Sequence, residues 1–386
     1  MKKTLKNILL GFALVAVLGA LALVLRARMG CSPAGDGAET TPRPAPTAES
    51  APTPVPTPTP DPEYFTISAV GDCTLASSQN FLESPYGYKA RMNGDYAYPF
   101  SNTVQYFAED DFTLANLECT LSDKKLSSME QFYFLSPTEW AEILVQGGVD
   151  FVNTANNHMM DFGQKGAEHT YAALKEHGVA YGVEGETSTF ITETGLKIGI
   201  YCDYNKYYPD VGKSAAAVAS LKKQGAEYII CAFHWGEKEL KYRPNEEQVE
   251  LARACIDAGA NLVYGSHAHC LQPIEEYKEG IILYGMGNWS FGGHTAPTDP
   301  DTAIVQISVK RDIDGSISNE GYTIIPCCVS SDLESAAVHR DNYNDYRPTP
   351  YAEGSEEYER ALSKITGTYQ GPDGSADYSD WWASWS

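Results

Sequence analysis

The stretch "NLVYGSHAHCLQP", residues 261–273, places a short apolar run in front of two histidines that are separated by one alanine. Leu262 to Tyr264 have the character of a buried β-strand. His267 and His269 follow, although the chain has only 8 histidines among 386 residues. Two interpretations are open at this point, namely a polar loop or a metal site at the carboxyl end of a strand.

The same arrangement, an apolar strand followed by a side chain of metal-ligand type, recurs four times elsewhere in the chain. The strands and the side chains at their ends are 64–70 with Asp72, 111–118 with Glu118, 149–155 with Asn157 and His158, and 226–236 with His234. Ligands of α/β proteins bind at the carboxyl ends of the strands. Five such ends in one domain therefore predict a common site.

Helical segments separate these strands. Amphipathic runs with glycines at their ends predict helices over 138–148, 163–178, 214–225 and 245–260, and later strands are expected over 280–292, 302–310 and 321–330. Alternation of strands and helices predicts an α/β domain in which helices cover sheets.

The six strongest candidates carry the donors that a pair of divalent metal ions requires. They are two carboxylates, one amide and three imidazoles, from Asp72, Glu118, Asn157, His234, His267 and His269. Such oxygen and nitrogen donors suit two ions of the Mn, Fe or Zn type. In an extended turn, His267 and His269 would project to the same side, one toward each metal.

Each candidate also has a purely structural interpretation. Asp72 fits a helix cap or a turn, and Glu118 fits a solvated strand end. Asn157 and His158 together fit a capped turn, and His234 fits a hydrogen-bonded core histidine. One genuine metal site would remove most of these alternatives together. The other histidines lack a strand end and are expected on surfaces or helices; they are His169, His177, His294 and His339.

The charge of the chain restricts its partners. With 28 Lys and Arg against 51 Asp and Glu, the formal net charge is −23. This balance argues against nucleic acid as a partner, and a polyanionic substrate would need a local cation such as a metal.

Cys73, Cys119 and Cys270 each directly follow a candidate ligand. Alternation along a strand turns these thiols away from the metals, so we expect none of them to be a ligand.

The N-terminal segment 1–28 is predicted to be an uncleaved transmembrane anchor. Ile8 to Leu25 is an unbroken apolar run preceded by lysines. The positive-inside rule then favours a single-pass protein of the cell membrane with its domain on the extracellular side. The alternatives are a cleaved signal peptide and a lipoprotein modified at Cys31, although Arg28 stands where that motif carries an aliphatic residue.

Four parts follow from the sequence. After the anchor, residues 29–62 form a Pro/Thr-rich linker of extended polyproline type, which lifts a domain off a surface. The domain is expected over 63–331, and 332–386 is expected to be a partly disordered tail with one helix around Glu356 to Ile365.

Six ordered motifs carry a resemblance to a known family. They are "GDCTL" (71–75), "NLE" (116–118), "NNHMMDFG" (156–163), "HWGEKE" (234–239), "GSHAH" (265–269) and "YGMGNWSF" (284–291). Their order resembles the bacterial capsule-synthesis protein CapA family, to which the poly-γ-glutamate synthesis and export component PgsA belongs. It resembles more distantly the calcineurin-like metallophosphoesterases. The resemblance implies a four-layer α/β-β/α sandwich of metallophosphoesterase type, with an anchor and an extracellular domain.

The resemblance also implies roles for individual residues. The implied first metal is bound by Asp72 and His269, the second by Asn157, His234 and His267, and Glu118 bridges the two. His158 is implied as a general acid, and Asp161 either orients it or caps the next helix. Glu237 and Asn288 match family positions expected to contact substrate or to support the ligands.

Two functions agree with the resemblance. One is a dinuclear metal-dependent hydrolase acting on a phosphoester or on an acidic capsule polymer. The other is a catalytically weak or inactive subunit that holds the polymer or a membrane synthase during export. The second stays open because the phosphoesterases begin with Asp-x-His, whereas Asp72 here is followed by Cys73 and Thr74. The first metal therefore lacks a nitrogen ligand at that position.

Overall fold

The computed structural model describes residues 61–128, 130–205, 210–236 and 242–371. The predicted anchor 1–28, nearly all of the linker and Glu237 lie outside these ranges. In the part of the chain that is described, no helix has the length and apolar character needed to cross a bilayer.

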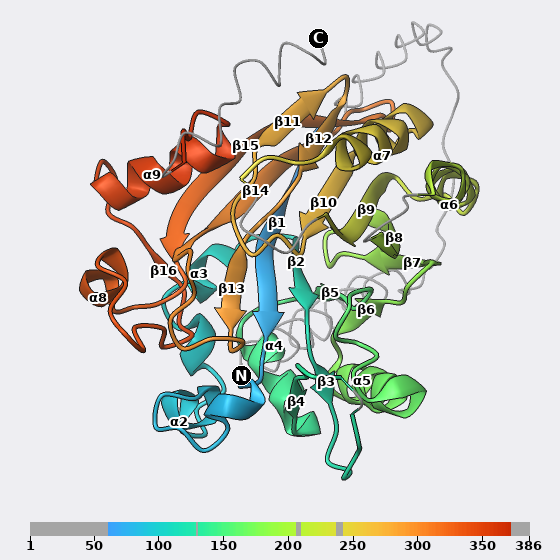
Figure 1. Cartoon of the computed structure of the whole chain (residues 1–386). Helices are drawn as coiled ribbons and strands as arrows, with labels where there is room; N and C mark the ends of the chain where they lie inside the picture. The colour runs from blue at the N-terminus through green and yellow to red at the C-terminus, as the bar shows by residue number, and fades with distance from the viewer. Residues whose placement is uncertain (1–60, 129, 206–209, 237–241, 372–386) are drawn as a thin grey trace, which may run out of the picture. The chain divides into compact units, whose positions relative to one another are not determined.

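Two β-sheets form the centre of the domain (Figure 1). The first has the strand order β16-β15-β14-β1-β2-β5-β6, and β13 pairs with β1 beside this path. Its strands are β1 (Glu63–Thr74), β2 (Phe112–Leu117), β5 (Phe151–Asn153), β6 (Ala180–Gly182), β13 (Asn288–Phe291), β14 (Asp301–Arg311), β15 (Ile317–Cys328) and β16 (Thr349–Pro350).

The second sheet has the order β11-β12-β10-β9-β8-β7. Its strands are β7 (Glu186–Ile191), β8 (Lys197–Asn205), β9 (Tyr228–Trp235), β10 (Leu262–Ser266), β11 (Ile274–Tyr277) and β12 (Gly280–Leu283). A separate pair consists of β3 (Thr120–Leu121) and β4 (Leu135–Ser136).

Each large sheet contains a block of parallel strands, which matters for the site. In the first sheet β1, β2, β5 and β6 are parallel neighbours. In the second sheet β8, β9, β10 and β12 are parallel neighbours. Antiparallel pairing occurs outside these blocks. It involves β14, β15 and β16 in the first sheet and the two edge strands β7 and β11 in the second. The carboxyl ends within each parallel block therefore lie along one edge of its sheet.

Four helices cover the outer faces of the sheets, namely α4 (Ala141–Gln146) and α5 (Gly163–His177) on the first and α6 (Val211–Lys223) and α7 (Glu246–Ala258) on the second. Helix α9 (Glu356–Ile365) instead packs on the central apolar cluster, and the shorter α2 (Tyr88–Met92), α3 (Val104–Phe107) and α8 (Leu333–Ala337) lie in connections. Single-turn 3₁₀ helices occur at η2 (Gln79–Phe81), η3 (Tyr98–Phe100) and η4 (Thr138–Trp140).

Three apolar clusters define the layers. One lies between the sheets and includes Ile67 of β1 and Ile230 of β9. A second joins the outer face of the first sheet to α4 and α5, and a third joins the outer face of the second sheet to α6 and α7. Alternation along β1 sends Ala69 to the central cluster and Val70 to the outer one. The order helix, sheet, sheet, helix is the α/β class that strand–helix alternation predicts.

The C-terminal part differs from the expected boundary at residue 331. Residues 332–371 contain α8, β16 and α9, and α9 occupies the range where the sequence predicts a helix. Ala361 and Ile365 of α9 join the central apolar cluster, and Lys364 is buried between them. Ion pairs of Lys364 and Arg360 with Asp299 and Asp301 add to this apolar attachment of α9. Residues 372–386 lie outside the described ranges.

Candidate metal centre

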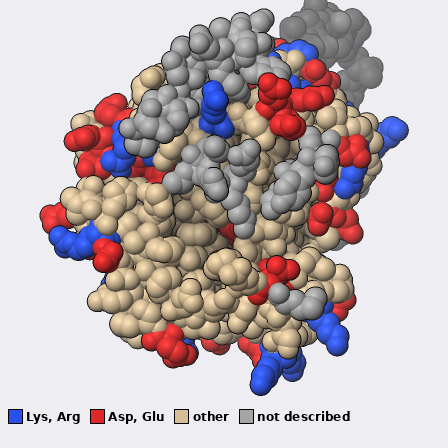
Figure 2. Space-filling view, viewed as in Figure 1, with Lys and Arg blue, Asp and Glu red and all other residues tan. Residues whose placement is uncertain are grey.

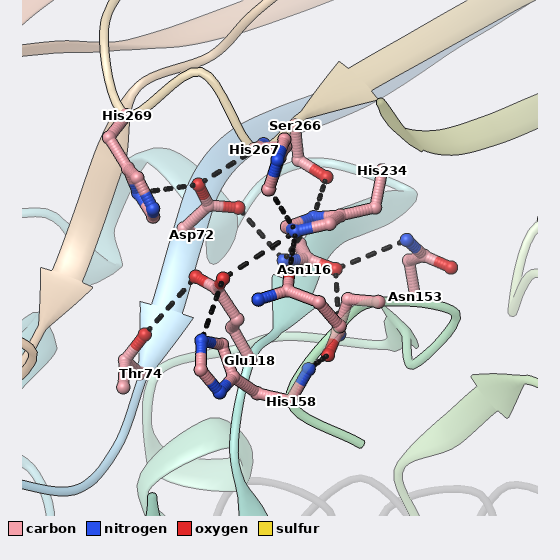
Figure 3. Close-up of polar contacts among 12 residues, drawn as sticks. Asp72, Thr74, Asn116, Glu118, Asn153, His158, His234, Ser266, His267 and His269 are labelled. Atoms are coloured by element: carbon pink, nitrogen blue, oxygen red, sulfur yellow. Dashed lines mark hydrogen bonds and ion pairs between the residues drawn. The ribbon is translucent and has the colours of Figure 1, made fainter. Parts of the chain in front are cut away.

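The ends of neighbouring parallel strands bring the candidate ligands together (Figure 3). Asp72 lies near the end of β1, and Glu118 directly follows β2, the parallel neighbour of β1. His234 lies near the end of β9, and His267 directly follows β10, the parallel neighbour of β9. The two edges meet because the sheets are stacked, and the Tyr264 hydroxyl of β10 donates across the interface to the Val70 carbonyl of β1 at 2.7 Å.

Two groups of potential metal ligands form at this meeting point, and they share one carboxylate. The first group is Asp72, Glu118 and His269, and the second is Glu118, His234 and His267. Within each group the ligand atoms lie within 4.8 Å of one another. Glu118 is thus the one residue that the two ligand groups have in common.

The second group is tightly convergent and includes a further amide. His234 Nε2 lies 2.7 Å from Asn157 Oδ1, 2.8 Å from His267 Nδ1 and 3.5 Å from Glu118 Oε1. A single imidazole hydrogen satisfies only one of these neighbours, whereas a metal ion accepts lone pairs from all of them. On its other side, His234 Nδ1 contacts Ser266 Oγ at 2.8 Å. This contact orients the ring.

The first group is held by hydrogen bonds around Asp72. Asp72 Oδ1 accepts from Asn116 Nδ2 at 2.8 Å, and Asp72 Oδ2 lies 3.4 Å from His269 Nδ1. His269 Nδ1 also lies 2.9 Å from Asn288 Oδ1, so Asn288 orients this ring. Burial opposes protonation of His269, but the charges of Glu118 and Asp72 raise its pKa to about 9. The pair of acids thus attracts positive charge to this position.

Glu118 tests whether these residues fit a metal. Its carboxylate is buried, and its Oε1 atom has no hydrogen-bond partner among the residues described. Burial alone would raise the pKa of Glu118, but the surrounding imidazoles, led by His269, hold it well below its usual range. No described Lys or Arg pairs with Asp72 or Glu118. A buried anionic pair with this set of donors fits divalent metal ions.

The backbone around the two loop histidines differs from the expected extended turn. His267 has φ 96° and His269 has φ 53°, both in a region that non-glycine residues rarely adopt. The prediction that an extended turn directs both side chains to the same side was therefore wrong, because neither residue has an extended backbone. Their rings still approach, with centroids 6.2 Å apart. Unfavourable backbone of this kind is concentrated at functional sites.

Gly71 makes the close approach at Asp72 possible. A Cβ atom at Gly71 would stand 2.1 Å from the Gly287 carbonyl oxygen. That same carbonyl accepts a hydrogen bond from the Asp72 N–H at 2.9 Å. The loop before β13 therefore packs directly on the end of β1, which brings Asn288 toward the site.

His158 and Asp161 form a second functional unit beside the ligands. His158 Nδ1 lies 3.0 Å from Asp161 Oδ2, which also accepts from the Phe134 N–H at 2.9 Å. Helix α5 begins at Gly163 without a side-chain cap. Of the two roles considered for Asp161, the structure therefore shows the contact that orients His158. The opposite ring atom, His158 Nε2, faces Glu118 Oε1 at 4.0 Å.

The cysteines beside the candidate ligands are buried, and two of them belong to an apolar cluster. Cys73, Cys119 and Cys270 are buried free thiols, and neither ligand group contains a cysteine. Cys73 and Cys119 belong to the outer apolar cluster of the first sheet. Burial raises the pKa of Cys119 to about 12, which keeps it a neutral thiol.

Several residues of the site were not singled out from the sequence. Asn116 Oδ1 accepts from Asn153 Nδ2 at 3.1 Å and from Asn156 Nδ2 at 3.2 Å, while its amide nitrogen holds Asp72. A fully buried asparagine inside an apolar strand was the available signal. His294, expected on a surface, is exposed and lines the opening of the site.

Comparison with known proteins identifies the family. Residues 66–292 match the model of the bacterial capsule synthesis protein PGA_cap, so the chain belongs to this family. The "Capsule biosynthesis protein CapA" of Bacillus anthracis is 28% identical over 275 residues, which cover 64% of each chain. The "PGA biosynthesis protein CapA" of Bacillus subtilis is 27% identical over 234 residues, covering 55% of this chain and 61% of that one.

The chain thus spans less than two thirds of the length of both Bacillus relatives. A "Probable polyglutamine synthesis accessory protein" of Mycobacterium tuberculosis is 24% identical over 263 residues, covering 56% of this chain and 69% of that one. Among solved structures, the sulfate thiohydrolase SoxB of Thermus thermophilus aligns with a TM-score of 0.39 at 12% identity, over 77% of this chain and 59% of that one.

Proposed function

We propose that this chain is a membrane-anchored, extracellular CapA-like protein that acts in capsule or poly-γ-glutamate biosynthesis or export. We further propose that its centre holds two divalent metal ions and hydrolyses an ester. The observation that carries the proposal is the carboxylate of Glu118, which is buried, lacks a hydrogen bond at Oε1 and belongs to two ligand groups. The names of the Bacillus relatives support the role in capsule synthesis.

The residues divide the work of such a centre between them. Asp72 and His269 would hold one ion, Asn157, His234 and His267 the other, and Glu118 both. Ions of the Mn, Fe or Zn type would supply Lewis-acid stabilisation of developing charge and activation of a water molecule.

Proton delivery belongs to His158. Asp161 holds Nδ1 of the ring, which leaves Nε2 directed toward Glu118 and the ligand groups. In hydrolysis, the oxygen of a water molecule bonds to phosphorus or to a carbonyl carbon and releases one proton to solvent. The bond from that atom to the leaving oxygen breaks, His158 donates its Nε2 proton to the leaving oxygen, and His158 is then reprotonated from solvent.

The proposed location and partners extend from the sequence. Residues 1–28 would anchor the protein in the cell membrane and residues 29–62 would carry the domain outside. Membrane synthase subunits and an acidic capsule polymer are the proposed partners. A net charge of −23 makes a metal-bearing centre the place where an anionic group would be accepted.

A second candidate function is a non-catalytic subunit that holds the polymer or synthase during export. The observation that favours it is the first ligand group, whose only imidazole is His269. Thr74 stands where the phosphoesterase pattern has histidine, and its hydroxyl contacts Glu118 Oε2 at 3.4 Å. Loss of a nitrogen donor weakens binding of a transition-metal ion.

Metal analysis of the purified full-length chain tests the centre. After expression with added Mn²⁺ or Zn²⁺, we expect about two ions per chain by inductively coupled plasma mass spectrometry. His267→Ala and His269→Ala should each lose about one ion. The matched control is His177→Ala, whose imidazole instead contacts the Ala173 carbonyl within α5. A wild-type chain that retains no stoichiometric metal would overturn the proposal.

Polymer output separates the two candidate functions. In a strain that depends on this chain for capsule polymer, an enzyme requires His158, whereas a holding subunit does not. His158→Ala should therefore abolish output if the chain acts as a hydrolase. Normal output from His158→Ala, combined with loss of output on removal of residues 1–28, would favour the holding subunit.

A further inference from the structure

A pocket opens directly beside the candidate metal ligands. Glu118, His158 and His269 form part of its lining. The pocket is therefore the route by which a substrate would reach both the ligand groups and the proton donor. Its walls decide which chemical groups can stand next to the bond that is cut.

Four phenylalanines form half of the remaining lining, namely Phe81, Phe132, Phe134 and Phe291, and the other half is Ser78, Asn80, Gly293 and His294. Phe291 stands against His269, with ring centroids 5.1 Å apart, and Phe134 stands edge-on to His158 at 4.7 Å. Phe132 is 57% exposed, which is unusual for a large apolar side chain. The aromatic wall thus begins at the two imidazoles and continues outward to solvent.

The lining contains no Lys or Arg among the residues described, and its one carboxylate is Glu118. His294 completes the rim, where its Nδ1 accepts the Ala296 N–H at 2.9 Å and its ring packs edge-on to Phe81. Most charged side chains on the face shown in Figure 2 lie toward its margins, and other residues form the broad central area.

Phenyl rings and a buried acid disfavour a segment of acidic polymer. A carboxylate of such a segment that lies against the phenylalanine rings would lose its bound water there. It would gain no ion pair in return, because the described lining has no Lys or Arg. An aromatic or aliphatic group would instead release water from both surfaces and would stack on the rings.

We propose that this site takes an ester whose organic group is aromatic or otherwise apolar, with the phosphoryl or acyl end on the metal ligands and the apolar group on the phenylalanine wall. The inference rests on the proposed metal-dependent hydrolase and names its class of substrate. The reacting molecule is then distinct from the acidic polymer itself.

Binding of two non-hydrolysable probes tests the wall. Phenylphosphonate and methylphosphonate carry the same metal-binding group and differ in the apolar substituent. By isothermal titration calorimetry on the metal-loaded full-length chain, we expect phenylphosphonate to bind about tenfold or more tightly than methylphosphonate. Phe132→Ala and Phe81→Ala should each lower this preference by about threefold or more, without changing metal content.

The control is Tyr64→Ala, which removes an aromatic side chain that is 63% exposed at the opposite end of β1 and should leave the preference unchanged. If metal-loaded protein binds both phosphonates equally, or binds neither, the proposed preference for an apolar group is wrong. The proposed metal centre is not contradicted by that result. The preference is also wrong if a γ-linked glutamate trimer competes with bound phenylphosphonate more strongly than methylphosphonate does. A chain that holds no metal overturns the proposed function, and this inference falls with it.

Discussion

The domain contains two buried pairs of acidic side chains, and their surroundings differ. Asp299 and Asp301 face protein cations. Lys364 Nζ lies 2.7 Å from Asp299 Oδ1 and 2.7 Å from Asp301 Oδ2, and Arg360 donates to Asp301 from Nε at 2.8 Å and from Nη2 at 2.7 Å. The second pair, Asp72 and Glu118, faces imidazoles, amides and a hydroxyl in the described part of the chain.

The first pair stabilises the fold through ion pairs, whereas the second fits a site for bound cations. Buried carboxylates are stable only when a cation or hydrogen bonds compensate them. Lys364 and Arg360 provide the cations for the pair at the start of β14 and thereby attach α9 to the sheet. At Asp72 and Glu118 the described residues provide imidazoles, amides and a hydroxyl, and no Lys or Arg; in the proposed function metal ions supply the positive charge there.

The largest expected effect comes from Lys364→Met, which removes the cation shared by Asp299 and Asp301. Because Asp299 then loses its cation and Asp301 keeps Arg360 as its one described cationic partner, we expect the free energy of unfolding to fall by about 3–5 kcal/mol in urea denaturation at neutral pH. Added Mn²⁺ should not restore it. The control is Lys310→Met, which removes a solvent-screened pair with Asp312 and should change the free energy of unfolding far less. Wild-type stability in Lys364→Met would show that the ion pairs of Lys364 do not stabilise the fold.

Glu118→Gln should have a smaller effect on stability at the other pair and a large effect on metal content. It replaces a buried carboxylate, whose pKa the surrounding imidazoles hold well below its usual range, by an amide of the same shape, so the metal-free protein should lose stability at neutral pH, by less than Lys364→Met. Metal content should fall from about two ions to one or none, because the shared carboxylate is lost. Urea denaturation in chelator and elemental analysis measure the two quantities. A metal-free variant destabilised as strongly as Lys364→Met would remove the distinction between the two clusters.

Asp161→Asn sharpens the comparison within the metal centre. The amide keeps an acceptor for the Phe134 N–H but loses the charge that holds His158 Nδ1. We expect kcat for ester hydrolysis to fall about 10- to 100-fold, with both metals retained. Steady-state kinetics and elemental analysis on the same preparation check this. Loss of metal in Asp161→Asn would place Asp161 among the groups that support the ligands.

The smallest effect is expected from Cys270→Ala. Its thiol is buried next to His269 in sequence but belongs to neither ligand group. Metal content should therefore stay at the wild-type value within error, and Cys73→Ala should behave in the same way. A loss of metal in either variant would contradict the assignment of these thiols to the packed interior.

The strand ends were predictable because their signals are local. The apolar runs before Asp72, Glu118 and His234 have strand character, and donor-type side chains at their ends stand out against apolar neighbours. The helices α5, α6 and α7 are likewise expected from local periodicity. The four-layer arrangement came from the family resemblance, and the three apolar clusters show it directly.

Other features depend on contacts between distant segments. The positive φ angles of His267 and His269 follow from a turn that places the His267 N–H 3.4 Å from Asp72 Oδ2, across 195 positions of sequence. Asn116 acquires its role only when β1, β2 and β5 lie side by side. The attachment of α9 rests on ion pairs with Asp299 and Asp301, which hydrophobic periodicity does not report.

By itself, the sequence determined the chemistry of this protein's centre, because the type of each donor and its place after a strand are local properties. Only the tertiary structure decided how the donors combine. Stacking of two sheets made Glu118 common to both ligand groups and turned His158 Nε2 toward it. The physical reason is that a bridging position depends on separations of a few ångströms between strands far apart in the chain, and packing of the whole sandwich sets those separations.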